Sequence, residues 1–271
     1  MLSIQVLCNE NNEFLQDLPT INNIYLHTFS LEEKKQIEHG NIQDDIYGVI
    51  INNSNDYLNE ICLFIKKRIP IFICDFHNLS PNKAKRLLDL HEEAASYIQV
   101  NSSNRFVFKD VNYWQRIENP QLISITKSFN TTKRYDLIEL IHIEIENIIA
   151  IIKSKPRKIT PVHIPKKTEE IQTIDVRIEF DNGAILKMTV SCILPESTHT
   201  IEFIKWNNYQ KIDLINCVYI HNESKEKFTK VTFPQHTEIT HFCTNLLNNK
   251  LPDVNIEDGI VTIELIDKII C

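Results

Sequence analysis

Short apolar runs alternate with helical segments through the first hundred residues, and this alternation limits the fold more than any other feature of the chain. Strands are expected at 2–8, 24–29, 46–51, 70–74 and 97–101. The run at 46–51 is continuously apolar, as in strands that are buried on both faces of a parallel sheet. Helices are expected at about 55–67 and 81–95, the second with Pro81 at its first position. The pattern indicates a parallel sheet covered by helices on both faces.

The pattern changes near residue 103. A strand is expected at 122–129 and a helix at about 134–152. Further strands are expected at 173–180, 184–192, 200–206, 211–220 and 228–233, and closing helices at about 235–249 and 257–270. We therefore expect two α/β domains. The first is a Rossmann-like domain at 1–103 with a shortened first βα unit, and the second is a domain at 104–271 with a large, mostly antiparallel open sheet.

The composition is that of a globular protein, with 42% hydrophobic and 24% charged residues among 271. A formal net charge of −7 argues against nucleic acid as a partner. The basic run at 153–167 could offer a local site, but it is broken by prolines and has no aromatic residue for base stacking. We interpret it as a solvated connector.

Seven cysteines occur without a CxxC pair or zinc-module spacing, so the sequence predicts no metal site and free thiols in the cytoplasm. Acidic residues interrupt the N-terminal segment, and no apolar run approaches about eighteen residues. We therefore expect neither a signal peptide nor a membrane partner.

Several segments, taken in order, resemble one known family. Residues 178–184 read Ile-Glu-Phe-Asp-Asn-Gly-Ala and form a predicted hairpin, with Ser191 closing its return strand. The end of the chain from 236 to 270 and the segments 46–55, 80–95 and 104–106 fit the same pattern. Together they resemble the glucose–fructose oxidoreductase/inositol dehydrogenase (Gfo/Idh/MocA) family over nearly the whole chain. The resemblance implies NAD(P)-dependent chemistry on sugars or polyols, and assembly through the open sheet.

The cofactor positions depart from this family. A dinucleotide needs a glycine-rich turn after the first strand, but residues 8–13 contain no glycine and two glutamates. The whole chain has only four glycines, where roughly four or five times as many are usual. The matching region is Cys8, Asn9, Asn52, Asn53 and Ser54, which we interpret as vestigial, so that no NAD(P) is expected.

The catalytic positions also depart. Asp75 stands where the family has the lysine of its Glu-Lys-Pro motif, which reverses the charge and removes a proton donor. His142 matches the family's general-base histidine, but Ile138 replaces the preceding aspartate. His142 has a second interpretation, as part of a polar stripe with Glu139 and Glu146 that makes ordinary surface ion pairs.

Cys74 lies at the end of a predicted strand beside Asp75 and near His77. A nucleophilic thiol is one interpretation, but the neighbouring carboxylate disfavours the thiolate, so a structural cysteine is the simpler one. Asp75 with His77 supplies only two metal ligands, too few for a site.

Three hypotheses follow from these departures. The first is a pseudoenzyme, a degenerate family member kept for assembly as a homo- or hetero-oligomer or for binding a small sugar-like ligand. The second is an active NAD(P)-dependent oxidoreductase of a sugar or polyol with an altered site. The third is a regulatory sensor that binds a metabolite in the old cleft.

Overall fold

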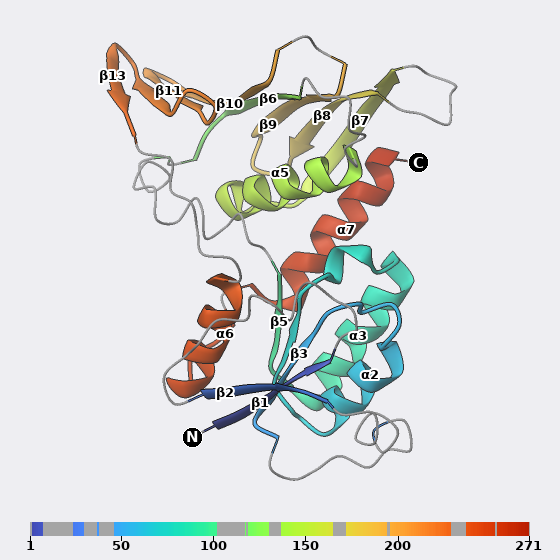
Figure 1. The fold of residues 1–271 in the computed structure, drawn as a ribbon. Coiled ribbons are helices and arrows are strands. Elements are labelled where there is room, and N and C mark those ends of the chain that lie inside the picture. The colour runs from blue at the N-terminus through green and yellow to red at the C-terminus, as the bar shows by residue number, and fades with distance from the viewer. Residues whose placement is uncertain are drawn as a thin grey trace. The chain divides into compact units, whose positions relative to one another are not determined.

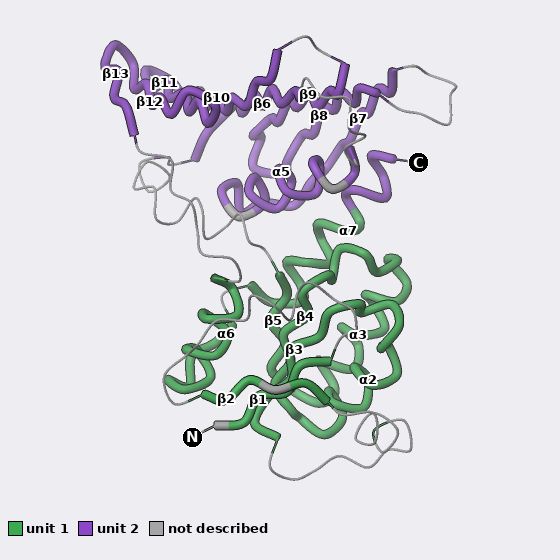
Figure 2. The backbone as a smooth tube through the Cα atoms, in the orientation of Figure 1, with its two compact units in different colours: residues 1–106, 233–264 green, residues 107–232, 265–271 purple. Residues whose placement is uncertain are grey.

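The computed structural model describes residues 2–7, 24–29, 37, 46–101, 117, 119–129, 137–164, 172–193, 196–228, 237–252 and 254–270. The chain divides into two compact units (Figure 2). The first comprises residues 1–106 and 233–264, and the second comprises 107–232 and 265–271. Each unit contains one sheet.

The first unit is built on a five-stranded parallel sheet (Figure 1). Its strands are β1 (Leu2–Leu7), β2 (Ile24–Thr28), β3 (Gly48–Ile51), β4 (Ile71–Ile73) and β5 (Ile98–Val100). Their order is β2-β1-β3-β4-β5, so that β1 lies between β2 and β3 and the chain then continues outward from β3 to β5. Every residue of β3, β4 and β5 is buried, as the continuous apolar runs indicate. The predicted Rossmann-like sheet is confirmed.

Helices cover both faces of this sheet. On one face lie α2 (Leu58–Lys66), α3 (Pro81–Ala94) and the first part of α7 (Ile256–Ile270), whose apolar residues share one core with alternate strand residues. On the other face lies α6 (Thr237–Leu247). Its buried residues pack against the strand side chains that point to this second face. Together they form a core of Ile4, Val6, Ile24, Ile50, Phe72, Ile239, Phe242, Cys243 and Leu246.

The two closing helices therefore group differently from the predicted domains. We expected 104–271 to form one domain, whereas α6 and residues 256–264 of α7 belong to the compact unit of the five-stranded sheet. Hydrophobic burial explains this grouping, because the Ile4 and Phe72 face of the sheet would otherwise be exposed. Gly259 allows α7 to approach closely, since a Cβ there would lie 2.8 Å from the ring of Phe76.

The second unit contains an eight-stranded sheet in the order β13-β12-β11-β10-β6-β9-β8-β7. The strands are β6 (Leu122–Ser128), β7 (Pro156–Ile164), β8 (Thr173–Phe180), β9 (Ile185–Ser191), β10 (Thr198–Lys205), β11 (Asn208–Asp213), β12 (Val218–His221) and β13 (Ser224–Lys227). Within this sheet, only the β6–β9 pair is parallel among the described strands. The helix α5 (Leu137–Ile152) lies along one face (Figure 1). The predicted mostly antiparallel sheet is confirmed.

Two predictions in this unit were wrong. The basic run 153–167 contains the strand β7 and is not merely a connector. Prolines are tolerated there because β7 is at the sheet edge and leaves one row of backbone groups unpaired. The stretch 211–220 is not one strand, because a turn after Asp213 divides it into β11 and β12. Asp213 accepts hydrogen bonds from the backbone N–H groups of Ile215 and Asn216 in that turn.

Candidate functional site

Asp75 and Ser54 come together at the carboxyl edge of the parallel sheet. Ser54 follows β3 and Asp75 follows β4, and these strands are neighbours. The buried backbone N–H of Ser54 donates to both carboxylate oxygens of Asp75, at 2.9 and 3.0 Å. The Ser54 hydroxyl donates to the backbone carbonyl of Asp75 at 3.3 Å. The Asp75 carboxylate is thus held by the turn after β3.

Further hydrogen bonds tie this edge together. The side-chain amide of Asn101, after β5, donates to the backbone carbonyl of Cys74 at 2.9 Å. The backbone N–H of Asn52 donates to Leu7 at the end of β1. Asn53 has a left-handed backbone, with φ of 72°. Cys8 and Asn9, the other predicted cofactor positions, lie outside the described residues.

His142 is a buried residue of α5. Its side chain is paired with Glu146 one turn further on, with 3.7 Å between Nδ1 and Oε1. The surface interpretation of this pair was wrong, because His142 is 9% exposed and Glu146 is 6% exposed. The sequence could predict the pairing from the four-residue spacing. It could not predict the burial, because residue spacing within a helix does not show which of its faces other segments will cover.

A second charged cluster lies under α5 and was not predicted. In the antiparallel register of β6 and β10, Lys127 pairs with His199, so both side chains lie on the α5 face of the sheet. Glu144 of α5 is completely buried against them. Its Oε1 lies 2.7 Å from Lys127 Nζ and 3.0 Å from His199 Nε2. Burial opposes ionisation, but the contacts with His199 and Lys127 lower the pKa of Glu144 to about 2.

Three buried polar atoms on α5 lack a hydrogen-bond partner. They are the amide nitrogen and oxygen of Asn147 and the Oε2 atom of Glu144. Asn147 is three residues after Glu144, so the two side chains emerge from adjacent turns of the helix. A buried polar group without a partner is costly, by about 1–3 kcal/mol. Hydroxyl groups of a ligand, or ordered water, would relieve this cost.

The sequence does contain a signal for the hidden cluster. Lys127 is on the same buried face of its strand as Ile123 and Ile125. Glu144 is on the same apolar face of its helix as Ile141 and Ile148. A charged residue on the apolar face of a strand, together with an opposite charge on the apolar face of a helix, indicates a buried ion pair.

Within the described ranges, no three His, Cys, Asp or Glu side chains gather as metal ligands. No described helix is long and apolar enough to cross a membrane.

The doubly covered parallel sheet, the mixed eight-stranded sheet and α5 define the fold of the Gfo/Idh/MocA-type oxidoreductases, as the sequence resemblance implied. A UDP-N-acetylglucosamine 3-dehydrogenase from Acidithiobacillus ferrooxidans is similar over 99% of this chain and 96% of its own, with a TM-score of 0.79 at 12% identity. A probable dehydrogenase from Thermotoga maritima covers 98% of this chain and 95% of its own, with a TM-score of 0.73 at 15% identity.

A putative myo-inositol dehydrogenase from Sinorhizobium meliloti 1021 covers 98% of this chain and 95% of its own, with a TM-score of 0.70 at 12% identity. The TM-scores establish a shared fold, whereas identities this low leave the chemistry open. No protein-family model and no curated protein matches the sequence.

Proposed function

We propose that this chain is a pseudoenzyme of the Gfo/Idh/MocA type, which has lost ordinary NAD(P) binding and hydride transfer. It is retained for assembly and for binding a small sugar-like ligand. The observation that carries the first part is the bond from the Ser54 N–H to the Asp75 carboxylate.

That bond occupies the part of the fold where open α/β sheets take their ligands, at the carboxyl ends of the strands. A backbone N–H there is a natural donor to a cofactor, but in this chain the Asp75 side chain already accepts it. A fixed carboxylate also opposes the approach of phosphate groups. In the position of the family's lysine, Asp75 serves the turn after β3 instead of a substrate oxygen.

Direct titration tests this proposal. NADH and NADPH are titrated into the protein by calorimetry, with an active dehydrogenase of the same fold measured in parallel. We expect no saturable heat at millimolar cofactor, because both the glycine turn and the free donor are missing. Micromolar binding would overturn the proposal and would restore an enzymatic role.

Asn147 and Glu144 support the ligand-binding part. Their three unpartnered buried atoms form a polar set that suits hydroxyl groups. We expect a member of a panel of hexoses and inositols to raise the melting temperature saturably, without turnover. In the variant Asn147→Leu this rise should disappear, while the ligand-free protein melts no lower, because two unpartnered atoms are removed. A panel without effect, or an undiminished rise in Asn147→Leu, would count against this part.

The second candidate is an active oxidoreductase acting on a sugar or polyol. What favours it is His142, which by the sequence resemblance matches the family's base and is paired with Glu146 at 3.7 Å. Consumption of NADH or NADPH that depends on a sugar and is lost in His142→Ala would support it. The cofactor titration separates the two candidates before any substrate is known.

A further inference from the structure

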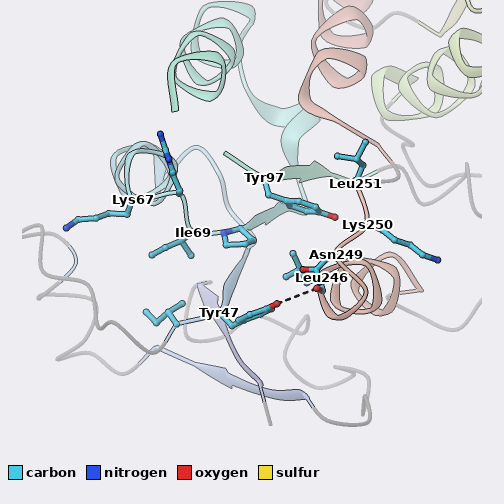
Figure 3. A pocket seen from close by; sticks show the side chains of 11 residues that line it. Tyr47, Lys67, Ile69, Tyr97, Leu246, Asn249, Lys250 and Leu251 are labelled. Carbon is cyan, nitrogen blue, oxygen red and sulfur yellow. Dashed lines mark hydrogen bonds between the residues drawn. The ribbon is translucent and has the colours of Figure 1, made fainter. Parts of the chain in front are cut away.

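A cavity of about 640 Å³ opens at the opposite, amino-terminal edge of the five-stranded sheet (Figure 3). Its lining comes from the residues that directly precede three neighbouring strands, together with the end of α6 and the residues after it. Its size is within the range of small-molecule sites, roughly 300–1,000 Å³. The carboxyl edge with Asp75 is at the other end of the same strands.

The inner part of this cavity is apolar and aromatic. Ile69 and Pro70 precede the middle strand β4 and are half-buried. Tyr47 and Tyr97 precede the strands on either side of it, and Figure 3 shows their rings on the two sides of this floor. Leu246 of α6 closes the floor, and its backbone carbonyl accepts a hydrogen bond from the Tyr47 hydroxyl at 3.4 Å.

The outer part is cationic. Lys67 and Arg68 follow α2, Lys250 follows α6, and all three are exposed. None of the described lining residues is acidic, although the chain as a whole has a net charge of −7. The side-chain amide of Asn249 adds a neutral donor at the same rim. An apolar floor under a rim of three cations suits an anion with a flat apolar body.

We propose that this cavity, the amino-edge pocket, binds a small organic anion that has an aromatic or similarly flat body. Its aromatic body lies on Pro70 between the two tyrosines, and its anionic group faces the cationic rim. Figure 3 shows Lys67 and Lys250 on opposite sides of the pocket, so the anionic group meets one side of the rim, and replacing Arg68 together with Lys250 removes a cation from each side. The proposal is independent of the proposed function, since no residue of the carboxyl edge or of α5 takes part. Cations that only complement the negative ends of α2 and α6 would stabilise those helices without binding a ligand.

Phenyl phosphate is a probe for this pocket, with benzyl alcohol as its neutral counterpart and inorganic phosphate as its anion alone. The test variant is Arg68→Asn with Lys250→Gln. Asparagine suits position 68 because Arg68 has a left-handed backbone, with φ of 58°. The matched control is Lys85→Gln, which removes an exposed positive charge from α3 away from the lining.

Calorimetry should show saturable binding of phenyl phosphate that is stronger than that of either partial probe. Loss of both cations should weaken it by about tenfold or more, whereas Lys85→Gln should leave it nearly unchanged. Ile46→Trp, which fills the lined space, should also abolish it. Absence of saturable binding at millimolar probe, equal binding of benzyl alcohol, or equal weakening by Lys85→Gln would overturn the proposal. NADH is also titrated into the double variant. NADH binding that the double variant retains would be assigned to the carboxyl edge and not to this pocket.

Discussion

Asp75 and Glu144 are carboxylates held by different kinds of partner. Asp75 accepts a hydrogen bond from one backbone N–H of a neighbouring turn. Removing the Asp75 side chain therefore removes an acceptor but leaves no buried charge without a counter-ion. Glu144 is completely buried between Lys127 and His199, so its loss leaves a buried cation without a counter-ion. The consequences of removing each side chain should therefore differ in size and in dependence on pH.

Replacing Asp75 by alanine should lower the free energy of unfolding by about 1–3 kcal/mol, because the buried Ser54 N–H loses its acceptor. Asp75→Asn keeps one carbonyl oxygen and should cost clearly less. Urea denaturation of the three proteins measures both effects. Equal stability of Asp75→Ala and the parent would show that the bond to Ser54 contributes nothing.

Replacing Glu144 by glutamine should cost about 3–5 kcal/mol at neutral pH, because Lys127 stays buried without its counter-ion. The folded-state pKa of Glu144, about 2, is below its ordinary value of 4.5. Its contribution to stability is therefore present above pH 4.5 and is lost as the pH falls toward 2. Denaturation across this range should bring the parent and variant curves together.

Glu223→Gln is the matched control, because Glu223 is exposed in the turn between β12 and β13. Its curve should stay close to that of the parent at every pH. A Glu144→Gln curve that runs parallel to the parent down to pH 2 would contradict the assigned ion pair.

At the scale of the elements, turns and helix ends need residues with positive φ, a position that glycine usually occupies. This chain has only four glycines, and asparagine occupies many of these positions instead. Nine described residues other than glycine have positive φ, and five of them are asparagines: Asn53, Asn119, Asn207, Asn222 and Asn249. Asparagine tolerates this backbone better than most residues because its short polar side chain bonds locally. Ala95, which ends α3 with φ of 49°, has no such compensation.

Ala95→Gly should therefore stabilise the protein, by roughly 0.5 kcal/mol after the extra freedom of the unfolded chain is subtracted. Ala94→Gly is the matched control within α3 and should destabilise by up to about 1 kcal/mol. Thermal melts of both variants test the assignment. A lower melting temperature for Ala95→Gly would show that the left-handed end of α3 is not strained.

At the scale of the whole molecule, the eight-stranded sheet has one face on α5 and one that no described helix of its unit covers (Figure 1). On this open face the strand registers align Thr200, Thr126, Thr189 and Asp175 in one row across β10, β6, β9 and β8. Opposite charges flank the row, such as Lys211 with Glu202 at 2.9 Å. Small polar residues with paired charges could meet a second copy face to face, which supports the proposed assembly.

Light scattering after size exclusion should therefore give a mass of at least two chains. Thr126→Arg should reduce it to one chain, because an arginine on the central strand places like charges against each other in a two-fold contact. Glu226→Arg, on the exposed edge strand β13, should leave the mass unchanged. A monomer at high concentration would contradict homomeric assembly through this face.

The sequence by itself determined the elements, because apolar periodicity and turn residues act over a few neighbours. The runs at 46–51 and 70–74 became β3 and β4, and the Asn-Gly turn became the β8–β9 hairpin with Gly183 at φ of 85°. Family-like motifs identified the two-sheet fold. The strand pattern also placed Asp75 just after a strand, and in the structure Asp75 follows β4, which ends at Ile73.

Only the tertiary structure decided which surfaces those elements bury. β7 is tolerant of proline because it has one free edge, and that edge exists only once the sheet is assembled. The grouping of α6 with the first sheet, the burial of His142, and the meeting of Lys127, Glu144 and His199 depend on contacts between segments far apart in the chain. Periodicity shows that a face is apolar, but packing alone selects the partner that covers it.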